Sequence, residues 1–150
     1  MVLPDVNILI YAHREDDPQH SAMGAWLAGI IDGDAAYAMS DLVLSSFVRI
    51  VTNPRAFAHP TPLDVALDAA DRCRSRRNCT VVSPGARHWS IFTQLCRAAG
   101  AKGNLVPDAY LAALAIESGS EWITTDRGFA RYPGLRWRHP LDPPRAVPTT

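Results

Sequence analysis

The chain has 150 residues, of which 47% are hydrophobic and 20% charged, and its formal net charge is zero. This length suits a single domain with one sizeable hydrophobic core. Zero net charge excludes binding of nucleic acid through overall basicity, so any such binding requires a local basic patch. No apolar run approaches the roughly 20 residues of a membrane helix, and no signal peptide is evident, which predicts a cytoplasmic protein without a membrane span.

The predicted elements alternate between strands and helices along the chain. In the first half they are a strand at 1–3, a turn or short helix at 6–12, a helix at 20–31, a strand at 35–40, a helix at 41–52 and a helix at 61–77. In the second half they are a strand at 79–83, a helix at 88–100, a loop at 101–107, a helix at 108–119, a strand at 121–125 and a basic stretch at 126–139.

Strands separated by helices of this length require crossover connections, so the sequence predicts an α/β fold with a mostly parallel sheet covered on both faces. We expect one domain over residues 1–140 and a flexible, proline-rich tail over residues 141–150. Three cysteines without paired C-x-x-C spacing argue against a disulfide framework or a structural zinc site. They are Cys73, Cys79 and Cys96.

Three acids lie where catalytic residues gather in parallel sheets, near the carboxyl ends of strands. Asp5 ends the apolar first strand, Asp126 follows the strand "WITT", and Asp108 begins the small-residue helix "DAYLAALA". A carboxylate in an apolar run needs a partner, because burying an unpaired charge is unfavourable. Converging carboxylates repel one another, and a divalent cation relieves that conflict. Ligands that are all oxygen favour Mg²⁺ or Mn²⁺ over zinc.

Structural roles compete with this interpretation. Asp108 fits a helix N-cap and Asp126 fits a turn ending in glycine. Asn7 fits a cap of the turn that follows it. Thr124 and Thr125 fit either strand propensity or the orientation of a water on the metal. Asp5 has few structural explanations of this kind, so the functional interpretation rests most on that residue. The five histidines have no ligand spacing and fit surface or hydrogen-bonded positions.

Four segments, in this order and spacing, resemble the PIN-domain ribonucleases of the VapC toxin type over nearly the whole chain. They are "DVNILIYA", "SSFVRIVTNPRAF", "GNLVPDAYLAALAIESG" and "WITTDRGFARYPGLRW". The resemblance implies a three-layer α/β/α fold and Mg²⁺- or Mn²⁺-dependent endonucleolytic cleavage of RNA. It also implies a homodimer, for which we expect apolar surface near Phe47, Phe57 or Leu63, and a small VapB-like antitoxin as partner.

Carried over by position, the metal-site acids of this family fall on Asp5, Asp108 and Asp126, with Asn7 and Thr125 as supporting neighbours. The family often places a glutamate where this chain has Leu44. Asp41 lies nearby, but it fits a first-turn acid of the helix at 41–52. The mechanism implied is hydrolysis by a metal-activated water, without a covalent nucleophile.

Arginine supplies 14 of the 15 basic residues, and its planar guanidinium suits phosphate recognition. Four arginines follow Asp126 and are the candidates for RNA contacts: Arg127, Arg131, Arg136 and Arg138. Two alternatives remain. A phosphatase of the haloacid-dehalogenase type requires a second Asp where Asn7 stands and a deeper lysine, whereas Lys102 is the only lysine. A catalytically impaired PIN-like module that retains antitoxin or RNA binding is favoured by Leu44.

Overall fold

Short parallel strands form the middle layer of this computed structural model, which describes residues 1–146. The strands are β1 (Val2–Pro4), β2 (Tyr37–Met39), β3 (Cys79–Val81), β4 (Glu121–Ile123) and β5 (Trp137–Arg138). Strands β1, β4 and β5 pair in parallel in that order, and β2 pairs in parallel with β3. Because β1 also lies against β2, the two sets continue one another and the predicted parallel arrangement is confirmed.

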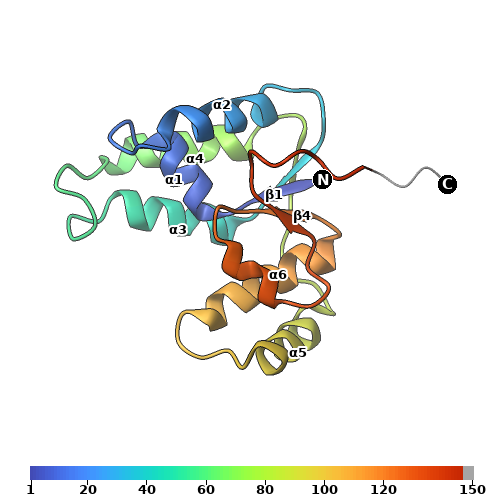
Figure 1. Cartoon of the computed structure of the whole chain (residues 1–150). Helices are drawn as coiled ribbons and strands as arrows, with labels where there is room; N and C mark the ends of the chain where they lie inside the picture. The colour runs from blue at the N-terminus through green and yellow to red at the C-terminus, as the bar shows by residue number, and fades with distance from the viewer. Residues whose placement is uncertain (147–150) are drawn as a thin grey trace.

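Helices cover both sides of these strands. They are α1 (Val6–His13), α2 (His20–Ile31), α3 (Asp41–Val51), α4 (Leu63–Arg74), α5 (His88–Ala99) and α6 (Leu105–Ser118). Helices α1 to α4 gather on one side of β1 and β4, whereas α5 and α6 lie together on the other (Figure 1). This arrangement confirms the three-layer α/β/α fold.

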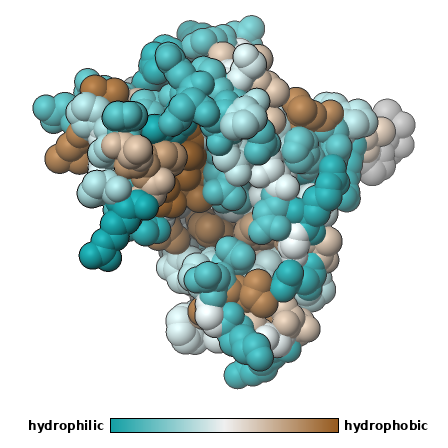
Figure 2. All heavy atoms as spheres, turned by 60° about the vertical axis from the view of Figure 1, so that its left-hand side comes forward, coloured by the Kyte–Doolittle hydropathy of each residue, from teal (hydrophilic) through white to brown (hydrophobic). Residues whose placement is uncertain are grey.

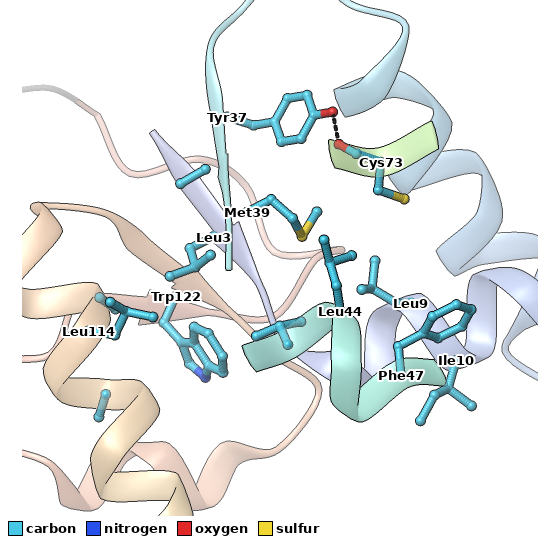
Figure 3. Close-up of a cluster of buried hydrophobic side chains, with 14 of the residues drawn as sticks. Leu3, Leu9, Ile10, Tyr37, Met39, Leu44, Phe47, Cys73, Leu114 and Trp122 are labelled. Carbon is cyan, nitrogen blue, oxygen red and sulfur yellow. Dashed lines mark hydrogen bonds between the residues drawn. The ribbon is translucent and has the colours of Figure 1, made fainter. Parts of the chain in front are cut away.

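The core fills the space between these layers. Figure 3 shows Leu3 and Trp122 on the central strands, with Leu114 of α6 on one side and Leu9 and Phe47 of α1 and α3 on the other. Helix α6 can lie close to the sheet because the face it turns inward is built from alanines that are fully buried. These are Ala109, Ala112, Ala113 and Ala115.

Two differences from the sequence prediction affect the region of the predicted acids. Helix α6 begins at Leu105, within the predicted loop 101–107, so Pro107 and Asp108 both lie in its first turn. Proline is tolerated there because the first backbone N–H groups of a helix have no intrahelical partner. The basic stretch contains a 3₁₀ helix, η1 (Arg127–Arg131), and the two-residue strand β5, neither of which periodicity could predict.

The side of α1 to α4 is mainly hydrophilic, with hydrophobic residues in a hollow near its middle (Figure 2). A cavity of about 440 Å³ opens among these helices, and Leu9, Leu27 and Phe47 contribute to its wall. Of the residues near which we expect dimer surface, Phe47 is only 2% exposed and Leu63 is 57% exposed, so Leu63 offers more apolar surface than Phe47. The homodimer itself stays a prediction.

The start of the predicted tail contacts the domain. Arg138 donates to the carbonyl oxygen of Asp142 at 3.2 Å, and Arg145 donates to that of Trp137 at 3.4 Å. Residues 147–150 lie outside the described residues, and the domain boundary at residue 140 stays a prediction. All three cysteines are free, as expected. None of the helices in residues 1–146 has the length and apolar character needed to span a bilayer.

Candidate active site

The pairing of β1 with β4 brings the ends of two distant segments together. Leu3 lies opposite Trp122 and Pro4 opposite Ile123, and the backbone N–H of Asp5 donates to the carbonyl oxygen of Ile123 at 2.8 Å. Asp5 is therefore the first residue past the carboxyl end of β1. This is the sheet edge at which the sequence predicted a site.

Asp5 is 4% exposed, yet its carboxylate has two hydrogen-bond donors. Its Oδ1 accepts from the backbone N–H of Val6 at 2.6 Å, and its Oδ2 accepts from the hydroxyl of Thr124 at 2.7 Å. Asp5 is also the N-cap of α1. Protein groups thus meet part of the cost of burying this acid in an apolar segment.

Burial raises the pKa of Asp5 to about 6. The hydrogen bonds from Thr124 and Val6 oppose this rise because they stabilise the charged carboxylate, and the negative charges of Asp108 and Asp126 add to it. The three predicted acids therefore share one electrostatic environment, although they are far apart in the sequence.

Thr124 links two of these acids. Its hydroxyl donates to Asp5 and accepts from the backbone N–H of Asp126 at 3.0 Å, so it is satisfied in both directions. The sequence interpretation left Thr124 open and favoured Thr125 and Asn7 as supporting residues. Both are partly exposed, and in residues 1–146 no hydrogen bond is found for either side chain. The signal that identifies Thr124 is the strand register, which places it next to Asp5.

Asp126 lies at the exposed rim of the site and caps η1. Its Oδ1 accepts from the backbone N–H of Gly128 at 2.8 Å. The structural interpretation of Asp126 as a turn residue is therefore correct, because its side chain caps η1. It does not exclude a second function, because Oδ2 has no partner among the hydrogen bonds of the described residues.

Asp108 lies in the first turn of α6 and is half-buried. The N-cap of this helix is Asn104, so the interpretation of Asp108 as an N-cap is wrong. Burial raises the pKa of Asp108, the charge of Asp126 raises it further, and the guanidinium of Arg131 lowers it. Tyr132 fastens η1 to this turn, since its hydroxyl donates to the carbonyl oxygen of Leu105 at 2.9 Å.

The three acids act on one another through their negative charges, but they are not arranged as a closed set of metal ligands. Within the described part of the chain, no three His, Cys, Asp or Glu side chains are arranged closely enough to hold a metal ion. The side chains still fit a hard divalent cation, because Asp5 and the acids whose charges raise its pKa all offer carboxylate oxygens. Their mutual repulsion is what a cation would relieve.

The four candidate arginines do not lie together at the acids. Arg131 lies near Asp108, and Arg127 reaches Asp142 at 3.7 Å. Arg136 donates to the carbonyl oxygen of Gly119 at 2.6 Å, and Arg138 forms a largely buried ion pair with Glu121, also at 2.6 Å. Gly119 and Glu121 precede or begin β4, so Arg136 and Arg138 contact the opposite end of this strand from Thr124.

The position where the family often has glutamate lies in the core. Leu44 is 5% exposed and points toward Leu9 and Met39 (Figure 3). Asp41 is exposed in the first turn of α3 and pairs with Arg74 at 2.7 Å, as expected for a first-turn acid outside the site. Neither residue adds an oxygen ligand to the three acids.

Comparison with known proteins gives consistent matches over the whole fold. The PIN domain family matches residues 2–135. Ribonuclease VapC43 of Mycobacterium tuberculosis is 43% identical over 142 residues, which cover 95% of this chain and 97% of that protein. Ribonuclease VapC25 of the same organism is 36% identical over 140 residues, which cover 93% and 99%.

Solved structures agree on the fold. Mycobacterium tuberculosis VapC20, described as a Sarcin-Ricin loop cleaving toxin, matches with a TM-score of 0.65 at 16% identity and covers 91% of this chain and 99% of its own. VapBC2 from Rickettsia felis, solved with a DNA fragment from its promoter, matches with a TM-score of 0.65 at 20% identity and covers 93% and 98%.

Proposed function

The chain belongs to the PIN-domain family and, within it, to the VapC ribonucleases, and on that premise we propose that it is the endoribonuclease toxin of a toxin–antitoxin pair. The reaction is hydrolysis of RNA phosphodiester bonds with Mg²⁺, or Mn²⁺ as a substitute. The observation that carries this proposal is the convergence of Asp5, Asp108 and Asp126 on one electrostatic environment at the carboxyl ends of β1 and β4.

Each residue of the site has a distinct function in this proposal. Asp5, Asp108 and Asp126 supply oxygen ligands, and Thr124 orients Asp5 by donating to its Oδ2. A divalent cation bound there would polarise the scissile phosphate and make a water molecule more acidic. The hydrogen bonds from Thr124 and Val6 favour the charged form of Asp5 against the effect of burial. A covalent nucleophile is not required.

Metal-dependent cleavage of labelled RNA by the purified protein, free of antitoxin, tests the proposal. We expect cleavage with Mg²⁺ or Mn²⁺ and none in EDTA. Cleavage that persists in EDTA would contradict a metal-dependent site. Absence of cleavage with either metal would favour the second candidate, a catalytically impaired module that retains antitoxin or RNA binding, for which Leu44 in place of a glutamate is the favouring observation.

The proposed antitoxin is a small VapB-like protein that inserts an Arg or Lys side chain among the acids. A cluster of carboxylates pairs well with such a group, which would compete with the cation. We therefore expect antitoxin to stop cleavage, and replacement of its inserted basic residue by Ala to restore cleavage. A complex in which Asp5 and Asp126 stay open to solvent would contradict this.

Thr124→Val is expected to weaken Mn²⁺ binding about tenfold, measured by calorimetry. Valine has nearly the shape of threonine but cannot donate to Asp5 or accept from Asp126. Loss of the hydrogen bond to the carboxylate would also raise the pKa of Asp5 further. Thr125→Val is the matched control and should bind Mn²⁺ as the wild type does. Equal effects of the two substitutions would show that Thr124 does not orient Asp5.

A further inference from the structure

The backbone of Gly128 forms hydrogen bonds with two side chains, those of Asp126 and Arg131. Its backbone N–H donates to Oδ1 of Asp126 at 2.8 Å, and its carbonyl oxygen accepts from Nε of Arg131, also at 2.8 Å. One peptide segment of η1 therefore fixes the carboxylate and the guanidinium on the same side of the turn.

The space beside Gly128 is occupied by these two side chains. A Cβ at this position would lie 2.8 Å from Oδ1 of Asp126 and 3.2 Å from Nη2 of Arg131. The backbone does not require glycine here, because Gly128 is absent from the residues with positive φ. The requirement for a small residue thus comes from the close approach of Asp126 and Arg131 to the turn.

Arg131 retains unused donors beside Asp126. Its Nε is used by Gly128, and in residues 1–146 its terminal nitrogens form no ion pair with a carboxylate. Its charge nevertheless reaches the site, since it lowers the pKa of Asp108. A guanidinium has five N–H donors, so donors remain for a ligand.

The net charge of the site indicates which ligand the unused N–H groups of Arg131 could bind. Three carboxylates and one divalent cation leave a net charge of about −1, which would repel a phosphodiester. The positive charge of Arg131 removes this repulsion. From this balance, and from the double anchoring by Gly128, we propose that Arg131 binds the scissile phosphate beside the acids. Gly128 is the positioning residue that places it there. The inference rests on the proposed ribonuclease function and assigns a substrate contact within it.

Arg131→Gln distinguishes a phosphate contact from a structural role of Arg131, because the proposal predicts that this substitution tightens Mn²⁺ binding and weakens RNA binding. Loss of a positive charge beside the acids should tighten binding of Mn²⁺ alone roughly fivefold in calorimetry. The same substitution should weaken binding of a short, fluorescent, single-stranded RNA at least about tenfold at saturating Mn²⁺, measured by stopped flow before cleavage, because a charge-assisted contact is lost. Arg131→Lys retains the charge and should restore the Mn²⁺ affinity of the wild type.

Arg97→Gln is the matched control for a change in net charge, because Arg97 is exposed in the last turn of α5. Unchanged or weaker Mn²⁺ binding in Arg131→Gln would overturn the proposal. So would a loss of RNA affinity no greater than that of Arg97→Gln. The Mn²⁺ titration needs no RNA, so its result stays informative if the protein cleaves none.

Gly128→Ala tests the positioning step. Because the atoms that a Cβ would meet are the ends of side chains, the fold should tolerate alanine while Asp126 and Arg131 move aside. We expect an unchanged melting temperature and at least about threefold weaker binding of RNA, because Arg131 loses its position beside the acids. Gly29→Ala, where a Cβ meets nothing within 4 Å, is the matched control. A wild-type RNA affinity in Gly128→Ala would overturn the assignment of Gly128.

Discussion

Asp5→Asn, Asp108→Asn and Asp126→Asn are each expected to lower metal-dependent RNA cleavage by at least about a hundredfold. Each substitution removes one proposed oxygen ligand from a site that has only three acids. Asparagine retains the N-cap of η1 at position 126, since its amide oxygen can still accept from Gly128. Cleavage of labelled RNA, with Asp41→Asn as the control for loss of an exposed acid, measures the effect. Full activity in two of the three variants would contradict a shared site.

The same substitutions should not destabilise the metal-free protein at neutral pH, because they relieve repulsion. For Asp5 the effect depends on pH. Its pKa is about 6 when folded and 3.8 in the reference state, so the folded form binds the proton more tightly. Stability from this group is therefore present at low pH and is lost as pH rises through about 6. The melting temperature of Asp5→Asn minus that of the wild type should grow between pH 4 and pH 7. A difference independent of pH would contradict the raised pKa.

The helices and strands that form the three layers could be predicted because each has a recognisable local sequence pattern. The apolar run at β1, the Ser40 cap before α3 and the alanines of α6 each specify an element without reference to distant residues. The start of α6 and the strand β5 were missed, because local rules conflict at the first and the second is too short to show a pattern. Pro107 resembles a helix boundary but is tolerated in a first turn, and β5 has only two residues.

The acids of the candidate site were predictable from the sequence, but the residues that contact them were not. Asp5 was identifiable because a carboxylate in an apolar strand requires a partner. Which of two adjacent threonines is that partner depends on the register between β1 and β4, which no local pattern gives. Similarly, Arg136 follows Asp126 closely in sequence, but the chain turns back at Gly134, and Arg136 reaches the carbonyl oxygen of Gly119.

Leu44→Glu is expected to destabilise the fold by several kcal/mol, which would lower the melting temperature by roughly 10 °C for a domain of this size. The side chain of Leu44 is 5% exposed and packs among Leu9, Met39 and Phe47. A glutamate placed there would have no cation beside it in this core, so burial would raise its pKa. The destabilisation should therefore shrink as the pH falls and the carboxyl becomes neutral. Thermal melts at several pH values measure both effects.

Leu42→Glu is the matched control, because Leu42 lies on the same helix and is 43% exposed, and it should leave the melting temperature nearly unchanged. Calorimetry with Mn²⁺ then decides whether position 44 has any connection to the acids. We expect no tighter Mn²⁺ binding in Leu44→Glu than in the wild type, because its side chain would have to leave the core to reach the site. A stable Leu44→Glu variant with tighter Mn²⁺ binding would show that this turn of α3 can rotate toward Asp5, and that the three acids accept a fourth.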